Sequence, residues 1–445
     1  MFFLSDASKV PALPTTLGSG SSGKTVRPIC SILALLVLAA GNLLAQSDSA
    51  QIELVGFAGS SRTDTQFLHE YLGIERRDPY TNKVRDEGAQ QLRNLGIFSN
   101  VTARIESTEQ GNRITYYLDE ALPILPLLNF GGISENFWFR VGAFDRNTFG
   151  RAGLFHVSYR YYDRHSFETY LTAPYQWGPQ WGIHAYAGRL ATREPVIIAE
   201  TDLEYDVDRW VAIARGRYNV NRKLHVELGG GVLIEEYDKV DTYTGTPGPA
   251  QASFQKTLGQ AMVVYDDVDY FGHRVTGFYE EAVAEIVTTA GEAGVFWKFI
   301  NTLKGYTGVW KDGIIGARLR TGIAKNDASP FLPFVLDSYI NVRGVGNRTA
   351  RGSSEVTVNL EYRHTVLEGS FGAVEAVSFV DVSGWRQAGQ SFSETFAKDN
   401  TVSFAGVGAR FYVQPWLNMV FRIDYGHSLR DDNRQGFVVG TGHYF

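Results

Sequence analysis

The sequence predicts a mainly β protein: a transmembrane antiparallel β-barrel of about 16 strands, preceded by one small α/β domain. Three observations predict it. Beyond Leu122 hydrophobic and polar residues alternate with period two, and no stretch keeps a helical period. The strands are long, with short connections such as "LEGS" alternating with long polar ones such as "KVDTYTGTPGPAQA". The chain also ends on a strand that closes with an aromatic residue, Phe445.

Composition excludes several classes of protein. The 445 residues carry a formal net charge of -6 and no basic stripe, so we expect no nucleic-acid partner. The single cysteine, Cys30, lies near the N-terminus, which leaves the rest of the chain without thiol chemistry, disulfides or zinc-thiolate sites. No G-x-S-x-G or H-E-x-x-H motif is present. We therefore predict no enzyme activity, no cofactor and no metal.

Residues 1–46 are predicted to be a leader and secretory signal peptide. Lys24 and Arg27 precede an apolar run from Ile29 to Ala45, in the order typical of an export signal. The alternative, a membrane anchor, needs about 20 apolar residues, and this run is shorter. The stretch from Gly18 to Thr25 matches G-x-x-x-x-G-K-[ST], but a signal sequence follows it rather than a phosphate-binding helix.

Residues 50–120 read as a small α/β domain. We expect a strand in "QIELVGFAG", a helix capped by Thr63 that ends near Leu72, and a second helix in "EGAQQLRNLGIFSNV" closed by Gly96. Two strands follow, "VTARIES" and "RITYYLDE". A small apolar core would come from the junction of the second helix and the next strand, through Leu92, Leu95, Phe98, Val101 and Ile105.

Residues 126–445 are predicted to form the barrel. In "NMVFRIDYG" the apolar Phe421 and Ile423 alternate with the charged Arg422 and Asp424. The same separation of charge from apolar side chains occurs in "FHVSYRYY" and "IIGARLRTGI". In a transmembrane barrel the apolar face contacts lipid and the polar face lines the lumen. A soluble sandwich would show the same alternation, but its strands need not be this long.

The tract "INVRGVGNRTARG", from Ile340 to Gly352, is one residue away from the G-x-G-x-x-G of dinucleotide-binding folds. It lies in a connection, residues 325–353, that has no helix after the glycines. A dinucleotide site needs a helix N-terminus for the pyrophosphate. We therefore reject a nucleotide site and expect the glycines to let a long loop turn back into the barrel.

Taken together, these motifs resemble a known family. "LRNLGIFSNVTARI" resembles the helix-to-strand junction of a POTRA (polypeptide-transport-associated) domain, and "VVYDDVDYFG" resembles an Asp-rich periplasmic turn. Val342, Arg343 and Gly344, between the eleventh and twelfth expected strands, resemble the loop motif of the outer-membrane superfamily that includes the assembly factor BamA and the two-partner secretion transporters. That family prefers an aromatic residue after Val-Arg-Gly, where this chain has Val345.

The resemblance implies a site inside the barrel. The loop 325–353 would fold into the lumen, and Arg343 would pair with Glu361 and Asp381 on the following two strands, with Phe379 on the same face as Asp381. The last strand, "GFVVGTGHYF", resembles the C-terminal recognition signal of outer-membrane barrels. Its shared face would carry Phe437, Val439, Thr441, His443 and Phe445.

The expected function is insertion or translocation of polypeptide at the bacterial outer membrane, with the POTRA domain in the periplasm. Its strand edge at Val101, Ala103 and Ile105 would pair with unfolded clients or a periplasmic partner by β-augmentation. The alternative is a passive pore, a lipid-handling protein or a structural barrel. Outer-membrane lipid is the expected surroundings of the barrel, and the sequence leaves open whether two copies form a homodimer.

Overall fold

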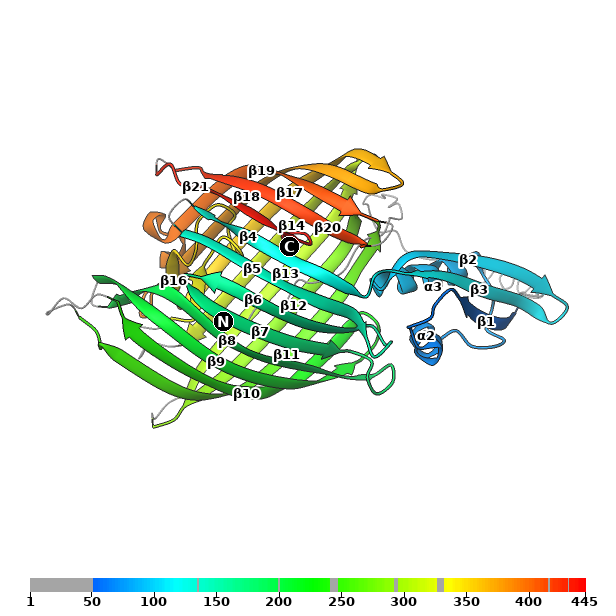
Figure 1. The fold of residues 1–445 in the computed structure, drawn as a ribbon, viewed down its shortest axis with the longest axis horizontal. Coiled ribbons are helices and arrows are strands. Elements are labelled where there is room, and N and C mark those ends of the chain that lie inside the picture. Colours follow the sequence, from blue (N-terminus) through cyan, green and yellow to red (C-terminus); the bar gives the residue numbers. More distant parts are fainter. Residues whose placement is uncertain are drawn as a thin grey trace, which may run out of the picture.

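The chain folds into two parts, a small N-terminal domain and a large barrel (Figure 1). The computed structural model describes residues 51–133, 136–198, 201–240, 247–291, 295–325, 332–414, 417–430 and 432–445. The predicted leader and signal peptide lie outside the described residues.

The N-terminal domain has the element order β-α-α-β-β. These elements are β1 (Ile52–Ala58), α2 (Thr65–Leu72), α3 (Asn82–Asn94), β2 (Phe98–Thr108) and β3 (Gly111–Glu120). The strands form a sheet of order β1-β3-β2, in which β1 and β3 are parallel and β2 is antiparallel to β3. Strand β2 therefore lies at one edge of the sheet.

Two helix starts differ from the expectation. The side chain of Asp64, not Thr63, caps α2 by accepting a hydrogen bond from the N–H of Gln66 at 2.9 Å. Thr63 instead donates to the carboxylate of Glu120. Helix α3 begins earlier than its apolar pattern indicated, at Asn82, because Thr81 supplies a side-chain cap there.

The core of this domain lies between the sheet and the two helices. Leu92, Phe98 and Val101 are buried in it, as expected, while Ile105 is only half-buried toward the open end of β2. The remaining core side chains come from both helices and all three strands, and include Phe67, Leu68, Leu72, Ile114, Tyr116 and Leu118. Among the residues described, no helix is both long and apolar enough to cross a membrane.

The barrel is a closed antiparallel sheet of sixteen strands, which confirms the predicted fold class. The strands are β4 (Ile124–Ile133), β5 (Asn136–Thr148), β6 (Gly153–Tyr162), β7 (Arg164–Ala173), β8 (Trp181–Ile198), β9 (Thr201–Asn219), β10 (Leu224–Lys239), β11 (Gln251–Phe271), β12 (Arg274–Thr289), β13 (Val295–Val309), β14 (Gly313–Lys325), β17 (Ser354–Gly369), β18 (Gly372–Arg386), β19 (Thr401–Val413), β20 (Met419–Ser428) and β21 (Gln435–Thr441). Two short 3₁₀ helices, Phe392–Phe396 and Lys398–Asn400, lie between β18 and β19.

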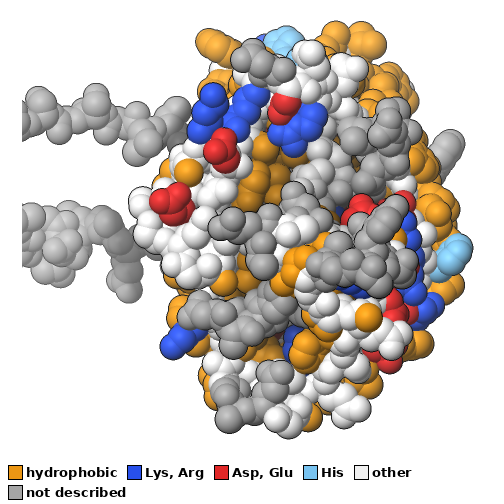
Figure 2. Space-filling model, turned by 90° about the vertical axis from the view of Figure 1, so that its left-hand side faces the viewer, with side chains coloured by type: hydrophobic (Ala, Val, Ile, Leu, Met, Phe, Trp, Pro, Cys, Tyr) orange, Lys and Arg blue, Asp and Glu red, His pale blue; other side chains and the backbone are white. Residues whose placement is uncertain are grey.

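The two faces of the barrel separate as the alternation predicted. On β20, Ile423 and Tyr425 are exposed on the outside while Arg422 and Asp424 are buried inside. The other strands follow the same pattern, with outward side chains such as Val358, Leu360, Val380 and Val382 exposed. An apolar outer surface around a polar lumen is the arrangement that lipid requires. At the end opposite the N-terminal domain, charged side chains of both signs are grouped on the rim (Figure 2).

The N-terminal domain contacts the mouth of the barrel that faces it (Figure 1). On one side Arg151 forms ion pairs with Asp64 at 3.2 Å and Glu70 at 2.7 Å. On the other side Asn94, at the end of α3, donates to Asp269 at 2.8 Å. Asp269 belongs to the Asp-rich segment just before the turn that joins β11 and β12. This segment therefore helps to hold the domain against the barrel.

Candidate functional site

Residues 332–353, in the connection between β14 and β17, the eleventh and twelfth strands of the barrel, run inside the lumen. They form a small hairpin from β15 (Phe334–Leu336) and β16 (Ala350–Gly352). Between these strands the backbone N–H of Ser338 donates to the carbonyl of Gly346 at 2.8 Å. The segment between Val342 and Asn347 is buried. We call residues 332–353 the lumen loop.

Arg343 lies at the tip of the lumen loop and is fully buried, with 0% of the residue exposed. Its Nε and Nη2 donate to the two carboxylate oxygens of Asp381, each at 2.9 Å, and its backbone N–H donates to the same side chain at 2.9 Å. Its Nη1 donates to Glu361. The structure thus brings together the three charged residues that the sequence grouped, with Asp381 held in a two-pronged contact.

This ion pair belongs to a larger buried network. Glu361 also accepts hydrogen bonds from Arg410 at 2.9 Å and from Arg363 at 2.5 Å. Arg410 in turn donates to Asp424 at 2.8 Å, and Asp424 lies 3.6 Å from Arg343. A buried guanidinium is tolerated only where several carboxylates and hydrogen bonds compensate its lost hydration. Four neighbouring strands, β17 to β20, supply that compensation here.

Two aromatic rings enclose the guanidinium of Arg343. Its central carbon lies 3.6 Å from the ring centre of Phe379 and 4.5 Å from that of Tyr444. A cation over the face of an aromatic ring is stabilised by the ring quadrupole. Val345 does not take part, because it packs in a separate apolar cluster with Val342 and Phe404. In this chain the rings beside Arg343 therefore come from the barrel wall and from Tyr444, and not from the residue after Val-Arg-Gly.

Gly344 lets the backbone of the lumen loop lie directly on the barrel wall. Its φ of 88° is in the left-handed region that favours glycine. A Cβ on Gly344 would lie 2.6 Å from the carbonyl oxygen of Gly426 on β20, and a Cβ on Gly426 would lie 2.4 Å from the carbonyl oxygen of Arg343. The two glycines face each other, and neither position has room for a side chain.

Arg348 and Arg351, the other two arginines of the tract from Ile340 to Gly352, bind a different part of the barrel wall. Arg348 forms an ion pair with Glu194 on β8, and Arg351 lies 2.5 Å from the second oxygen of the same carboxylate. Arg209 on β9 also donates to Glu194, at 2.9 Å. Glu194 is 1% exposed. Sequence reasoning missed this second anchor, although the inward alternation of Thr192 with Glu194 was a signal that could have found it.

The end of the last strand differs from the expectation. Phe437 is exposed on the outer face and Val439 is half-buried on it, but β21 ends at Thr441. Gly442 has a φ of 80°, and the residues after it turn into the lumen. His443 and Phe445 therefore do not share the outer face of Phe437, and Phe445 is only 3% exposed.

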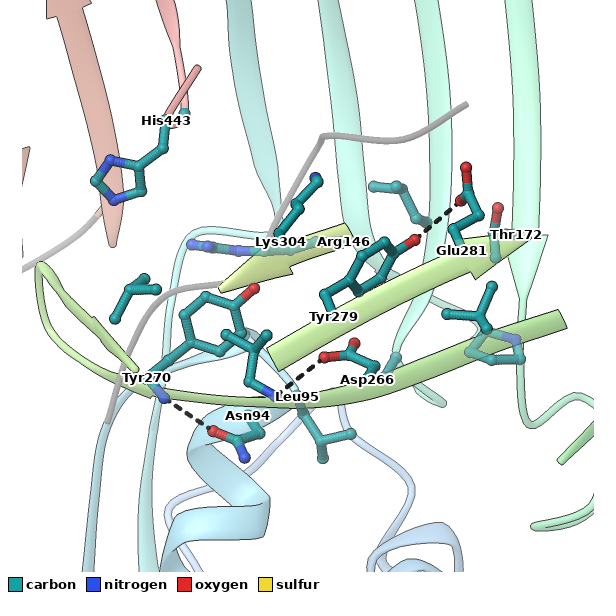
Figure 3. A pocket seen from close by; sticks show the side chains of 18 of the residues that line it. Asn94, Leu95, Arg146, Thr172, Asp266, Tyr270, Tyr279, Glu281, Lys304 and His443 are labelled. Carbon is teal, nitrogen blue, oxygen red and sulfur yellow. Dashed lines mark hydrogen bonds between the residues drawn. The ribbon is translucent and has the colours of Figure 1, made fainter. Parts of the chain in front are cut away.

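A cavity of about 880 Å³ lies between the lumen loop and the N-terminal domain. The domain closes one side of it with Asn94 and Leu95, and the barrel wall contributes Tyr279 and Lys304 (Figure 3). The hydroxyl of Tyr279 donates to Glu281 at 2.9 Å. The lining carries side chains of both signs of charge, such as Lys304 and Glu281, beside apolar ones such as Leu127.

The fold and the site define a class of protein: a transmembrane β-barrel whose lumen is crossed by an anchored loop and whose mouth carries an α/β domain. Residues 50–121 match the POTRA family, described as a surface antigen variable number repeat. A search of curated proteins gives no match. The N-terminal domain is thus a POTRA domain, and the chain has one copy of it in the described residues.

Solved structures with a similar fold cover 88% of the chain, including the barrel. BamA from Haemophilus ducreyi lacking POTRA domains 1–3 superposes with a TM-score of 0.54 at 11% identity, covering 88% of this chain and 85% of that one. CdiB from Acinetobacter baumannii gives 0.57 at 12%, covering 88% and 73%. CdiB from Escherichia coli gives 0.59 at 10%, covering 88% and 76%. The resemblance inferred from the sequence is confirmed at the level of the fold, which the chain shares with these BamA and CdiB barrels.

Proposed function

We propose that this protein is an outer-membrane barrel that inserts polypeptide into the outer membrane or translocates it across, with its POTRA domain in the periplasm. One observation carries the proposal: two unpaired strand edges lie at the same mouth of the molecule. One is the edge of β2 in the POTRA domain, and the other is the first half of β4 in the barrel. An unpaired edge is a template for an extended chain.

The β2 edge supports capture of a client. Strand β2 pairs with β3 on one side only, and no further strand covers its other side among the described residues. Near its start, the carbonyl of Phe98 accepts from Asn418 at 3.1 Å and that of Val101 accepts from Arg93 at 2.8 Å. The rest of the strand, through Ala103 and Ile105, is available for β-augmentation, in which the backbone of an extended peptide adds a strand.

The barrel edge supports release or insertion of a client. Strands β21 and β4 are joined through only three residue pairs, from Phe437 opposite Gly132 to Val439 opposite Phe130. The neighbouring pair β4 and β5 has ten. Within the described part of the chain, the segment of β4 from Ile124 to Asn129 therefore has no partner strand on that side, and Pro126 within it is a residue typical of edge strands.

The lumen loop weighs against a passive pore. It is bound to opposite walls through Arg343 and through Arg348, so solutes would have to pass beside a fixed obstruction. Depletion of the protein in cells separates the two proposals. General loss of outer-membrane barrels or of an exported polypeptide supports transport of protein. A normal envelope with altered solute or lipid content supports the alternative.

Photo-crosslinking in cells tests the proposal directly. A photoreactive residue at Arg104, exposed on β2, should give adducts with unfolded polypeptide clients. The matched control is Lys83, which is exposed on α3 of the same domain, away from the strand edge. Adducts at Arg104 but not at Lys83 support β-augmentation. Equal adducts at both positions, or none at either, would count against it.

A further inference from the structure

The connection between β18 and β19 lies against the outside of the barrel wall. It carries the two 3₁₀ helices Phe392–Phe396 and Lys398–Asn400, at the end of the barrel away from the POTRA domain (Figure 1). Strand alternation places Val380, Val382 and Gly384 of β18 on the outer face, and the two valines are exposed there. Gly384 is buried instead, because the first 3₁₀ helix covers it.

Thr395 fixes the first 3₁₀ helix to that outer face. Thr395 is fully buried, and its hydroxyl oxygen lies 3.1 Å from that of Ser354, which shares the outward positions of β17 with Val356 and Val358. A Cβ on Gly384 would lie 2.2 Å from the carbonyl oxygen of Thr395, so no side chain fits there while the helix is in place. The connection therefore packs on the lipid-facing side of the wall and not in the lumen.

Hydrogen bonds hold the connection in one conformation. The N–H of Glu394 donates to the carbonyl of Ser391 at 3.1 Å, and the side-chain amide of Asn400 donates to the carbonyl of Glu394 at 2.9 Å. Arg430, just beyond the end of β20, donates to the carbonyl of Lys398 at 2.5 Å. The segment that rests on the wall is thus ordered by its own contacts and by those with β17, β18 and the end of β20.

Two phenylalanine rings of this ordered segment are exposed. Phe392 and Phe396 are 56% and 58% exposed, and their ring centres lie 5.8 Å apart with the planes at 81°. Large apolar side chains that stay exposed side by side mark a surface that binds something other than water. Because Val358 and Val382 are exposed further along the same two strands, the rings continue the apolar outer surface of the barrel past the ends of β17 and β18.

Polar side chains of the same segment identify the kind of surface it fits. Ser393, Glu394, Lys398 and Asp399 are exposed beside the two rings. Deep in the hydrocarbon these charges would be costly to bury, and in water the rings would gain nothing from their exposure. Apolar rings next to charges of both signs are typical of a segment that lies at the boundary between acyl chains and headgroups.

We propose that residues 391–400 form a lipid-binding element, which places Phe392 and Phe396 among the acyl chains of the leaflet on the side away from the POTRA domain. Its partner is the boundary between hydrocarbon and headgroups of a bilayer, and not a protein. The contact of Thr395 with Gly384 sets the depth of the rings by holding the segment on the outer wall. The proposal requires that the barrel lies in a membrane, and it does not depend on what the barrel transports.

Spin labelling of the full-length protein in phosphatidylethanolamine–phosphatidylglycerol liposomes tests the lipid contact. In a Cys30→Ser background, a nitroxide at Phe396→Cys should collide often with oxygen, which concentrates in hydrocarbon, and rarely with a water-soluble nickel chelate. The ratio of the two collision rates should be about fivefold higher than at Gln390→Cys, an exposed position in the same connection, because only the first label is in lipid. Val382→Cys on the outer wall gives the ratio for full lipid contact.

Two outcomes of this measurement would overturn the proposal. One is a ratio at position 396 equal to that at position 390, which would place the ring in water. The other is a low collision rate with both reagents at position 396, which would show that a protein surface covers the ring.

A second variant tests the contact that places the rings. Gly384→Leu puts an apolar side chain where the carbonyl of Thr395 lies, so the connection must move off the wall, and the ratio at position 396 should fall about threefold. Val380→Leu, on the same face of β18 but away from the connection, is the matched control and should leave the ratio unchanged. Heat-modifiable migration in electrophoresis shows whether the barrel is folded, and Gly384→Ala, which adds only the clashing Cβ, replaces the leucine variant if it is not. An unchanged ratio in the folded variant would overturn the role of Thr395 and Gly384.

Discussion

The lumen loop is held at two places, and the two differ in how they bury charge. At one, Arg343 is enclosed by the carboxylates of Asp381 and Glu361 and by two aromatic rings. At the other, a single carboxylate, Glu194, receives Arg348 and Arg351 of the loop. The first site has its own balanced network on four strands, whereas the second depends on one residue. We therefore expect the Arg343 anchor to stabilise the barrel and the Glu194 anchor to position the loop.

The largest effect is expected at the first anchor. Arg343→Ala leaves Asp381 without the only cation that contacts it in the described structure. Loss of one partner of a buried ion pair costs about 3–5 kcal/mol, because the remaining charge is uncompensated. We expect the folded barrel to lose its resistance to heat in semi-native electrophoresis at a markedly lower temperature. Arg343→Lys should recover only part of this loss, since an ammonium cannot make the two-pronged contact.

The same variant separates a structural role from a functional one. If Arg343→Ala abolishes client insertion while the barrel keeps its heat resistance, the purely structural interpretation of the ion pair is wrong. Combining Arg343→Ala with Asp381→Asn removes both charges. This double variant should be more stable than Arg343→Ala alone, because no carboxylate is then buried without a partner.

Sequence reasoning reached the first anchor and the fold, but not the second anchor or the tail. Period-two alternation determines which side chains face lipid, so the barrel and the inward position of Glu361 followed from local pattern, whereas Asp381 and the pairing with Arg343 came from the family resemblance. Alternation on β8 places Glu194 in the lumen, but its partner Arg348 lies on a distant loop of irregular backbone, and alternation does not identify that partner. The turn at Gly442 depends on contacts of Tyr444 and Phe445 with the lumen loop, β13, β14 and β20, so local alternation predicted a straight strand there.

A smaller effect is expected at the second anchor. Glu194→Ala removes the acceptor of Arg348 and Arg351, while Arg209 keeps its ion pair with Glu235 at 2.7 Å. The side chains of Arg348 and Arg351 are 13% and 7% exposed, so water replaces part of the lost contact and we expect a cost of about 1–3 kcal/mol. Because the Arg343 anchor is intact, we expect the barrel to stay folded and the released end of the loop to raise conductance in planar bilayers.

Matched variants keep this prediction specific. Glu236→Ala removes the same charge from an exposed, outward position on β10 and should leave conductance unchanged. Adding Arg348→Ala and Arg351→Ala to Glu194→Ala should raise conductance little further. All three substitutions remove the same anchor, the contact between the loop arginines and Glu194. An unchanged conductance in Glu194→Ala would mean that the first anchor alone positions the loop.

The smallest effect concerns the junction between the POTRA domain and the barrel, where Glu120 lies at the end of β3. Despite its partial burial, hydrogen bonds from Thr63, Ser61 and Arg62 lower the pKa of Glu120 to about 2. Thr63 also accepts from Asn147 of the barrel at 2.9 Å. A carboxyl group with a depressed pKa in the folded state stabilises the protein above its unfolded pKa of about 4.3, and this contribution is lost as the pH falls toward 2.

Glu120→Gln should therefore lower the urea midpoint of the POTRA domain at about pH 6, by the equivalent of about 1 kcal/mol after solvent screening, and the difference should shrink by about pH 3. Circular dichroism at the helical minimum follows α2 and α3 in the full-length protein, and Glu106→Gln on the exposed face of β2 is the control for charge. A difference that stays constant with pH would show that Glu120 acts through its shape and not through its charge.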